Sequence, residues 1–151
     1  MTTFDPFSKT EVLQIINNVA LFMGIGPHEQ GMLADKCYTS EHKANEIIIE
    51  QGDIANKLYV IIEGRVLVSV KRGSAQWKRI NTLGPGDVFG EIAIMRNIPR
   101  TARITTLTAS TFLTISNKDF LAAYQYFPPK ARDNIQLVIA KRLKENQSHA
   151  Q

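Results

Sequence analysis

One acidic and one basic residue, Glu91 and Arg100, stand nine positions apart in the stretch FGEIAIMRNIPRTA, which begins at Phe89. Gly90 precedes the acid, and a proline precedes the base. An arginine guanidinium matches phosphate oxygens two at a time, and a glycine lets a ligand approach the backbone closely because it has no Cβ. The spacing therefore predicts a site for a small anion, with Arg100 as the charged partner.

The run that follows Gly90, from Glu91 to Met95, can form a short helix. The first N–H groups of a helix have no partner inside it and carry partial positive charge, so they suit a phosphate. Glu91 needs a separate explanation, because a carboxylate repels a phosphate. It fits a ligand that also has a hydroxyl, as a ribose phosphate does, and it could in addition pair with Arg100. The alternative is a surface ion pair between Glu91 and Arg100 beside a turn.

The rest of the chain predicts a mainly β fold with flanking helices. Short apolar runs separated by Gly, Asp or Asn extend over residues 37–116, and this spacing is typical of a jelly-roll β-barrel rather than a parallel sheet. Residues 8–36 have helical patterns that open with a Ser-Lys-Thr-Glu capping box. Residues 117–146 are helical again, and over 130–146 the apolar residues form one stripe. The length fits a single domain over residues 1–151.

The stretch FGEIAIMRNIPRTA closely resembles the phosphate-binding cassette of cyclic nucleotide-binding domains. EQGDIANKLYVIIEGRVLV and LGPGDVFGE are similar to the glycine-punctuated strands of the same family, and the resemblance covers residues 21–143. It implies that Glu91 binds the ribose 2′-hydroxyl, that Arg100 binds the cyclic phosphate, and that the helix from Lys130 is a lid over the base. It also implies that the amides of Ile92, Ala93 and Thr101 bind the phosphate oxygens. Three further residues would line the pocket: Val68, Ile80 and Phe89.

Two residues are candidates to contact the base. The hydroxyl of Thr101 either reads the base or satisfies a nearby backbone group, and both possibilities stay open. Arg142 belongs to a basic cluster that suits the C-terminal end of a helix, and its place near the apolar stripe favours it to reach the base. The motif reads the ribose phosphate that cAMP and cGMP share. We expect cAMP to bind at least as well as cGMP, because no acidic residue of the lid is clearly placed to pair with the guanine edge, and Glu145 is the only late candidate.

Composition and charge exclude several other classes of protein. Hydrophobic residues make up 44% of the chain, and 18 basic against 14 acidic residues give a net charge of +4, which is too mild to predict a nucleic-acid partner. The three histidines share no ligand spacing and Cys37 is alone, so we expect no metal, no disulfide and no cofactor. No nucleophile–base pair is visible, which predicts a protein that is not an enzyme.

The chain is expected to be cytoplasmic, because it shows no signal peptide and its apolar runs are too short to cross a bilayer. We expect no membrane contact by this chain alone.

The sequence thus predicts a sensor that binds cAMP, cGMP or both and moves its C-terminal helix when occupied. Its partner would be a protein effector or a fused effector domain. One rival is the same fold sensing another ligand or acting through protein contacts. A second is the sensor half of a DNA-binding regulator of the catabolite-activator type, although only about five residues follow Asn146 in this sequence. A cupin-like enzyme without a metal is the third.

Overall fold

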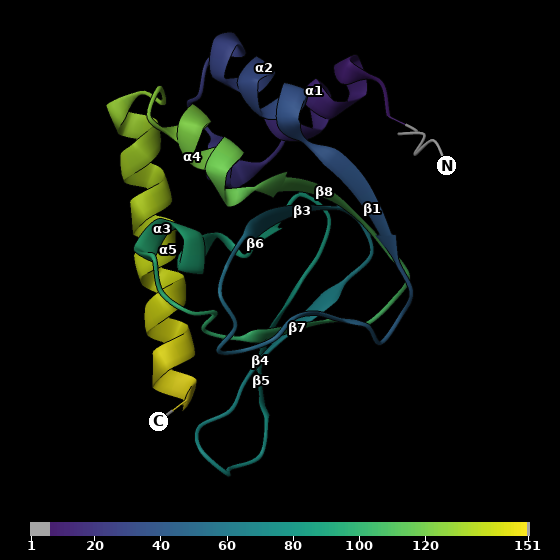
Figure 1. Ribbon diagram of the computed structural model, residues 1–151, viewed down its shortest axis with the longest axis vertical. Coiled ribbons are helices and arrows are strands. Elements are labelled where there is room, and N and C mark those ends of the chain that lie inside the picture. The colour runs from purple at the N-terminus through teal and green to yellow at the C-terminus, as the bar shows by residue number, and fades with distance from the viewer. Residues whose placement is uncertain (1–6, 151) are drawn as a thin grey trace.

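The computed structural model describes residues 7–150, with side chains as far as residue 146. Its centre is a pair of antiparallel four-stranded sheets (Figure 1). In spatial order, the first sheet contains β1 (Tyr38–His42), β8 (Ser110–Ser116), β3 (Lys57–Glu63) and β6 (Val88–Phe89). The second contains β2 (Ile47–Ile49), β7 (Arg103–Thr106), β4 (Val66–Val70) and β5 (Lys78–Leu83). The predicted mainly β jelly-roll fold with flanking helices is confirmed, but the two sheets are not closed into a barrel.

A hydrophobic core fills the space between the two sheets. On β4 the alternating residues Val66, Val68 and Val70 all face this core, as the two-residue period of a strand requires. The core also contains residues from both sheets and from the loop before β7: Ile49, Ile61, Phe89, Ala102, Ile104 and Phe112. Because apolar side chains of both sheets pack together in this core, the second sheet is held against the first.

Helices cover the outer face of the first sheet (Figure 1). They are α1 (Lys9–Asn17), the 3-10 helix η1 (Ala20–Phe22), α2 (Pro27–Lys36) and α4 (Asn117–Tyr124). The predicted capping box is confirmed, because the Ser8 hydroxyl accepts from the Glu11 amide and the Glu11 carboxylate accepts from the Ser8 amide. These helices and the sheet beneath them share a second, larger core.

The last helix, α5 (Pro129–Ala150), runs along one side of the molecule from the helical layer toward the β4–β5 hairpin (Figure 1). The predicted helix over 130–146 is confirmed, and it begins one residue earlier, at a proline that suits the first turn. Ala131, Ile135 and Ile139 are buried and pack into the larger core. Within the described residues, no helix is long and apolar enough to span a membrane.

Two sets of contacts hold the two ends of the loop that connects β4 to β5, at Lys71 and Trp77. The side-chain amide of Gln51 donates to the Lys71 carbonyl at 2.7 Å, and its oxygen accepts from the Lys71 amide at 2.9 Å. The Arg103 guanidinium stacks on the Trp77 ring, 3.7 Å from Cζ to the ring centroid, and donates two hydrogen bonds to the Glu50 carboxylate at 2.8 and 3.0 Å. The hairpin is therefore a fixed projection of the second sheet.

We expect the Glu50 contact to make stability depend on pH. Hydrogen bonding to Arg103 lowers the pKa of the Glu50 carboxyl below its ordinary value of 4.5. A carboxyl with a depressed folded-state pKa contributes stability at neutral pH, and that contribution is lost as the pH falls from about 4.5 through the folded-state pKa. Glu50→Gln should flatten the fall of the melting temperature with acidification, and the loss at pH 7 should be under about 1 kcal/mol because the pair is partly exposed. Glu63→Gln, at an exposed carboxyl, is the control, and equal acid slopes in the two variants would contradict the assignment.

Candidate functional site

A cavity with about 580 Å³ of empty space, part of it open to solvent, lies between the second sheet, the helix α3 (Glu91–Arg96) and the C-terminal half of α5. All ten residues that the sequence predicts as ligand-binding line it: Val68, Ile80, Phe89, Gly90, Glu91, Ile92, Ala93, Arg100, Thr101 and Arg142. The fold thus brings residues of the continuous motif together with residues from β4, β5 and α5. Their role in binding stays a prediction.

Gly90 forms the turn between β6 and α3. Its φ of 89° lies in the left-handed region, which side chains with a Cβ rarely adopt. A Cβ at this position would also lie 2.9 Å from Nη1 of Arg100 and 3.0 Å from the carbonyl oxygen of Lys57. The glycine is therefore required both by the backbone conformation and by the approach of the Arg100 side chain.

Arg100 is a buried cation, only 7% exposed, at the wall of the cavity. Its guanidinium donates to the carbonyl oxygens of Gly90 and Lys57, each at 2.7 Å. Among the described residues, no carboxylate lies within 4 Å of it. Burial lowers the pKa of the Arg100 guanidinium below its usual value, because the charged form loses hydration. A buried charge with only neutral partners is costly, so this site favours an incoming anion.

Glu91 is a buried anion in the same cavity, only 2% exposed. Its Oε1 accepts from Arg142 of α5, and the same guanidinium nitrogen donates to the Val88 carbonyl at 2.7 Å. Glu91 therefore pairs with Arg142 and not with Arg100, and the alternative of a surface ion pair does not describe these buried residues. The second carboxylate oxygen of Glu91 has no hydrogen-bond partner among the described residues, and it is not sealed from solvent.

A second polar contact joins α5 to the motif. The side-chain amide of Asn146 donates to the hydroxyl of Thr101 at 3.0 Å. Asn146 follows Arg142 by four residues, so both side chains leave the same face of α5, one turn apart. The Thr101 hydroxyl thus contacts the C-terminal helix, and Arg142 contacts a carboxylate where the sequence suggested a base. Asn146 was not among the site residues predicted from the sequence, although its spacing of four residues from Arg142 places it on the same helix face.

The fold and the cavity together define a β-sandwich binding domain with a helix closing one side of its pocket. A family model for the cyclic nucleotide-binding domain matches residues 39–127, which is more than half of the chain. The chain belongs to the cyclic nucleotide-binding domain family, as the resemblance of its motif implies.

Curated and solved relatives agree with this assignment. The CRP-like cAMP-activated global transcriptional regulator of Mycobacterium tuberculosis is 24% identical over 136 residues, which cover 90% of this chain and 60% of that relative. The regulatory domain of Toxoplasma gondii PKA with cAMP has a TM-score of 0.80 at 19% identity, covering 88% of this chain and 50% of that one. The regulatory subunit of a cAMP-independent protein kinase A from Trypanosoma cruzi, bound to guanosine, has a TM-score of 0.73 at 24% identity, covering 78% and 42%. The chain thus spans less than two thirds of the relatives it matches.

The pair between Arg142 and Glu91 predicts how α5 behaves before any ligand binds. Arg142→Gln leaves a buried carboxylate without its counter-ion, at a cost of about 1–3 kcal/mol. We expect amide hydrogen exchange over residues 138–146 to accelerate by about tenfold or more in the ligand-free variant, at about 1.4 kcal/mol per tenfold.

Lys141→Gln is the matched control, because Lys141 is the exposed neighbour of Arg142 on the same helix. Glu91→Gln in the Arg142→Gln background should recover part of the protection, because it removes the unpaired charge. Unchanged exchange in Arg142→Gln, or equal acceleration in Lys141→Gln, would mean that the ion pair does not hold α5.

Proposed function

We propose that this domain is a sensor that binds a cyclic nucleotide in the cavity, with cAMP as its main ligand and cGMP bound no more tightly. The observation that carries the proposal is the buried guanidinium of Arg100, which lines the cavity without a carboxylate partner among the described residues. A cyclic phosphate supplies the missing negative charge. Two hydrogen bonds to backbone carbonyl oxygens already orient the guanidinium. The side chain therefore loses little conformational entropy when the anion binds.

The free oxygen of Glu91 supports recognition of the sugar. A ribose 2′-hydroxyl can donate to this oxygen while the other oxygen keeps its bond to Arg142. The positive charge of Arg142 also offsets the repulsion between the Glu91 carboxylate and a phosphate bound at Arg100. A carboxylate and a phosphate site can thus share one small cavity, which resolves the electrostatic conflict seen in the sequence.

The same contacts support a regulatory output. Glu91 and Thr101 lie on the cassette and bind side chains of α5, so occupancy of the cavity biases the position of that helix. We propose a regulator and not an enzyme, acting in the cytoplasm on a protein effector or a fused effector domain. The relatives named above are described as a regulator, a regulatory domain and a regulatory subunit, which supports this proposal.

A second candidate ligand comes from the fold neighbour bound to guanosine. A nucleoside has the hydroxyls that suit Glu91 but no phosphate, so it would leave Arg100 without an anionic partner. Sensitivity of affinity to Arg100 therefore separates the two ligands. Guanosine and cAMP should be titrated side by side with cGMP.

Calorimetric titration of Arg100 variants tests the proposal. Removing one partner of a desolvated charge pair costs about 2–5 kcal/mol. We expect Arg100→Ala to weaken cAMP affinity by tens to thousands of times, at about 1.4 kcal/mol per tenfold. Arg100→Lys should recover only part, because it keeps the charge but loses the planar fork of donors.

Thermal unfolding must show that the Arg100 variants are folded, since the side chain also bonds two carbonyl groups. Arg96→Ala is a control, because Arg96 is the last residue of α3, four residues before Arg100, and it contacts Gln136 outside the cavity. Tight guanosine binding that is indifferent to Arg100, together with no binding of cAMP or cGMP, would replace the cyclic nucleotide with a nucleoside. Near-native cAMP affinity in folded Arg100→Ala would contradict the phosphate assignment.

A further inference from the structure

The net positive charge of the chain comes from one hairpin, because basic residues there are not balanced by acidic ones. Five of the 18 basic residues lie within residues 64–86, where the sequence contains no acidic residue. They are Arg65, Lys71, Arg72, Lys78 and Arg79. The other 13 basic residues stand against 14 acidic ones, so the remainder of the chain is close to neutral. The mild net charge of +4 therefore describes a nearly neutral body that carries a strongly basic β4–β5 hairpin.

The hairpin projects from the body at the end opposite the helical layer (Figure 1). Arg72, Lys78 and Arg79 are exposed, and Lys71 is half-buried. Within residues 7–146, none of these four forms an ion pair, and none lines the cavity. Arg72, Lys78 and Arg79 are thus available to an external anion. Lys71 has no anionic partner either, but its Nζ lies 5.8 Å from the centroid of the Trp77 ring and its backbone is held by Gln51.

The cations lie on both sides of the hairpin. Lys78 pairs in register with Val70, which faces the core, whereas Arg79 pairs with Ser69 on the opposite side. A flat acidic protein surface can contact only one side of such a hairpin. A layer of anionic headgroups can surround it, so that cations on both sides find partners. The turn residues Gly73, Ser74 and Ala75 are small, which suits entry between headgroups without an apolar wedge.

We propose that the β4–β5 hairpin binds the surface of an anionic lipid bilayer, through Lys71, Arg72, Lys78 and Arg79. This departs from the sequence-based expectation of no membrane contact. The contact is peripheral and electrostatic, so it weakens as salt rises. Lysines on an edge strand also prevent edge-to-edge pairing, and that role accounts for Lys78 and Arg79. It does not account for Lys71 and Arg72, which precede the strand and lie in the turn region.

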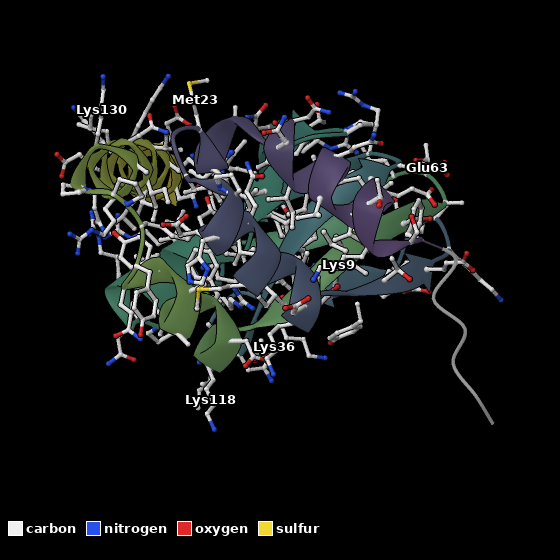
Figure 2. All side chains as sticks on the ribbon, turned by 90° about the horizontal axis from the view of Figure 1, so that it is seen from above. Lys9, Met23, Lys36, Glu63, Lys118 and Lys130 are labelled. Carbon is white, nitrogen blue, oxygen red and sulfur yellow. The ribbon has the colours of Figure 1, made fainter. Side chains whose placement is uncertain are left out.

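Sedimentation with lipid vesicles tests the proposal on the full chain. The hairpin variant changes all four cations to glutamine. The control variant changes Lys9, Lys36, Lys118 and Lys130 to glutamine, which removes the same charge from the helical end of the molecule (Figure 2). Vesicles of phosphatidylcholine alone are compared with vesicles that also contain phosphatidylserine, at low and at physiological salt. Circular dichroism and thermal unfolding show whether both variants are folded. Neither these controls nor vesicle sedimentation depends on nucleotide binding, so the proposal can fail independently of the proposed function.

The native chain should bind the phosphatidylserine vesicles and ignore phosphatidylcholine alone. The hairpin variant should lose about a hundredfold or more in its partition coefficient, because each cation near an anionic surface contributes about a factor of five. The control variant should lose about tenfold at most at physiological salt, because its charges lie on the helical end, opposite the hairpin, and charges far from a contact are largely screened. Equal losses in the two variants would overturn the proposal, because they would show that vesicle binding depends on the net charge of the chain and not on the hairpin. No vesicle binding by the native chain, or binding of polyglutamate or single-stranded DNA in its place, would also overturn it.

Discussion

The buried carboxylate of Glu91 needs a counter-ion, and the structure supplies it from α5. Arg142 is 51 residues further along the chain, so the pair forms only when α5 lies against the cassette. The apolar stripe of α5 brings the helix to the body, but Ile135 and Ile139 pack toward the helical layer and not into the cavity. The C-terminal half of α5 is held by polar contacts from Arg142 to Glu91 and the Val88 carbonyl and from Asn146 to Thr101. Leu143 adds apolar packing against the larger core. A ligand that reaches Glu91 or Thr101 acts on the contacts that hold the helix.

Two buried charges of opposite sign thus share one cavity without neutralising each other. Arg100 donates hydrogen bonds to backbone carbonyl oxygens, and Glu91 forms an ion pair with Arg142 of α5. This arrangement keeps Arg100 available to an anion, whereas a direct pair with Glu91 would have satisfied both charges and closed the site. The left-handed turn at Gly90 makes the arrangement possible, since it brings Arg100 against the start of α3.

Much of the fold and most of the cavity lining could be predicted from the sequence, because their signals are local. The capping box at Ser8, the alternating valines of β4 and the motif from Phe89 to Ala102 each lie within a short stretch. The partner of Glu91 and the contact of Asn146 could not be predicted, since they join segments 51 and 45 residues apart. The regular spacing of short strands likewise cannot distinguish a closed barrel from two stacked sheets. Averaging the charge over the chain hid the basic hairpin, which the strand pairing of β4 and β5 makes visible.

The most direct test of the account is a double-mutant cycle on cAMP affinity with Glu91→Gln, Arg142→Gln and the double variant, measured by calorimetry. If Glu91 is shared between α5 and the ribose, the two changes are coupled, and the double variant loses less affinity than the two single losses combined. We expect a coupling energy of about 0.5–3 kcal/mol, the range for residues in direct contact. Losses that add within about 0.3–0.5 kcal/mol would show that α5 and the ligand use Glu91 independently, and would contradict the account.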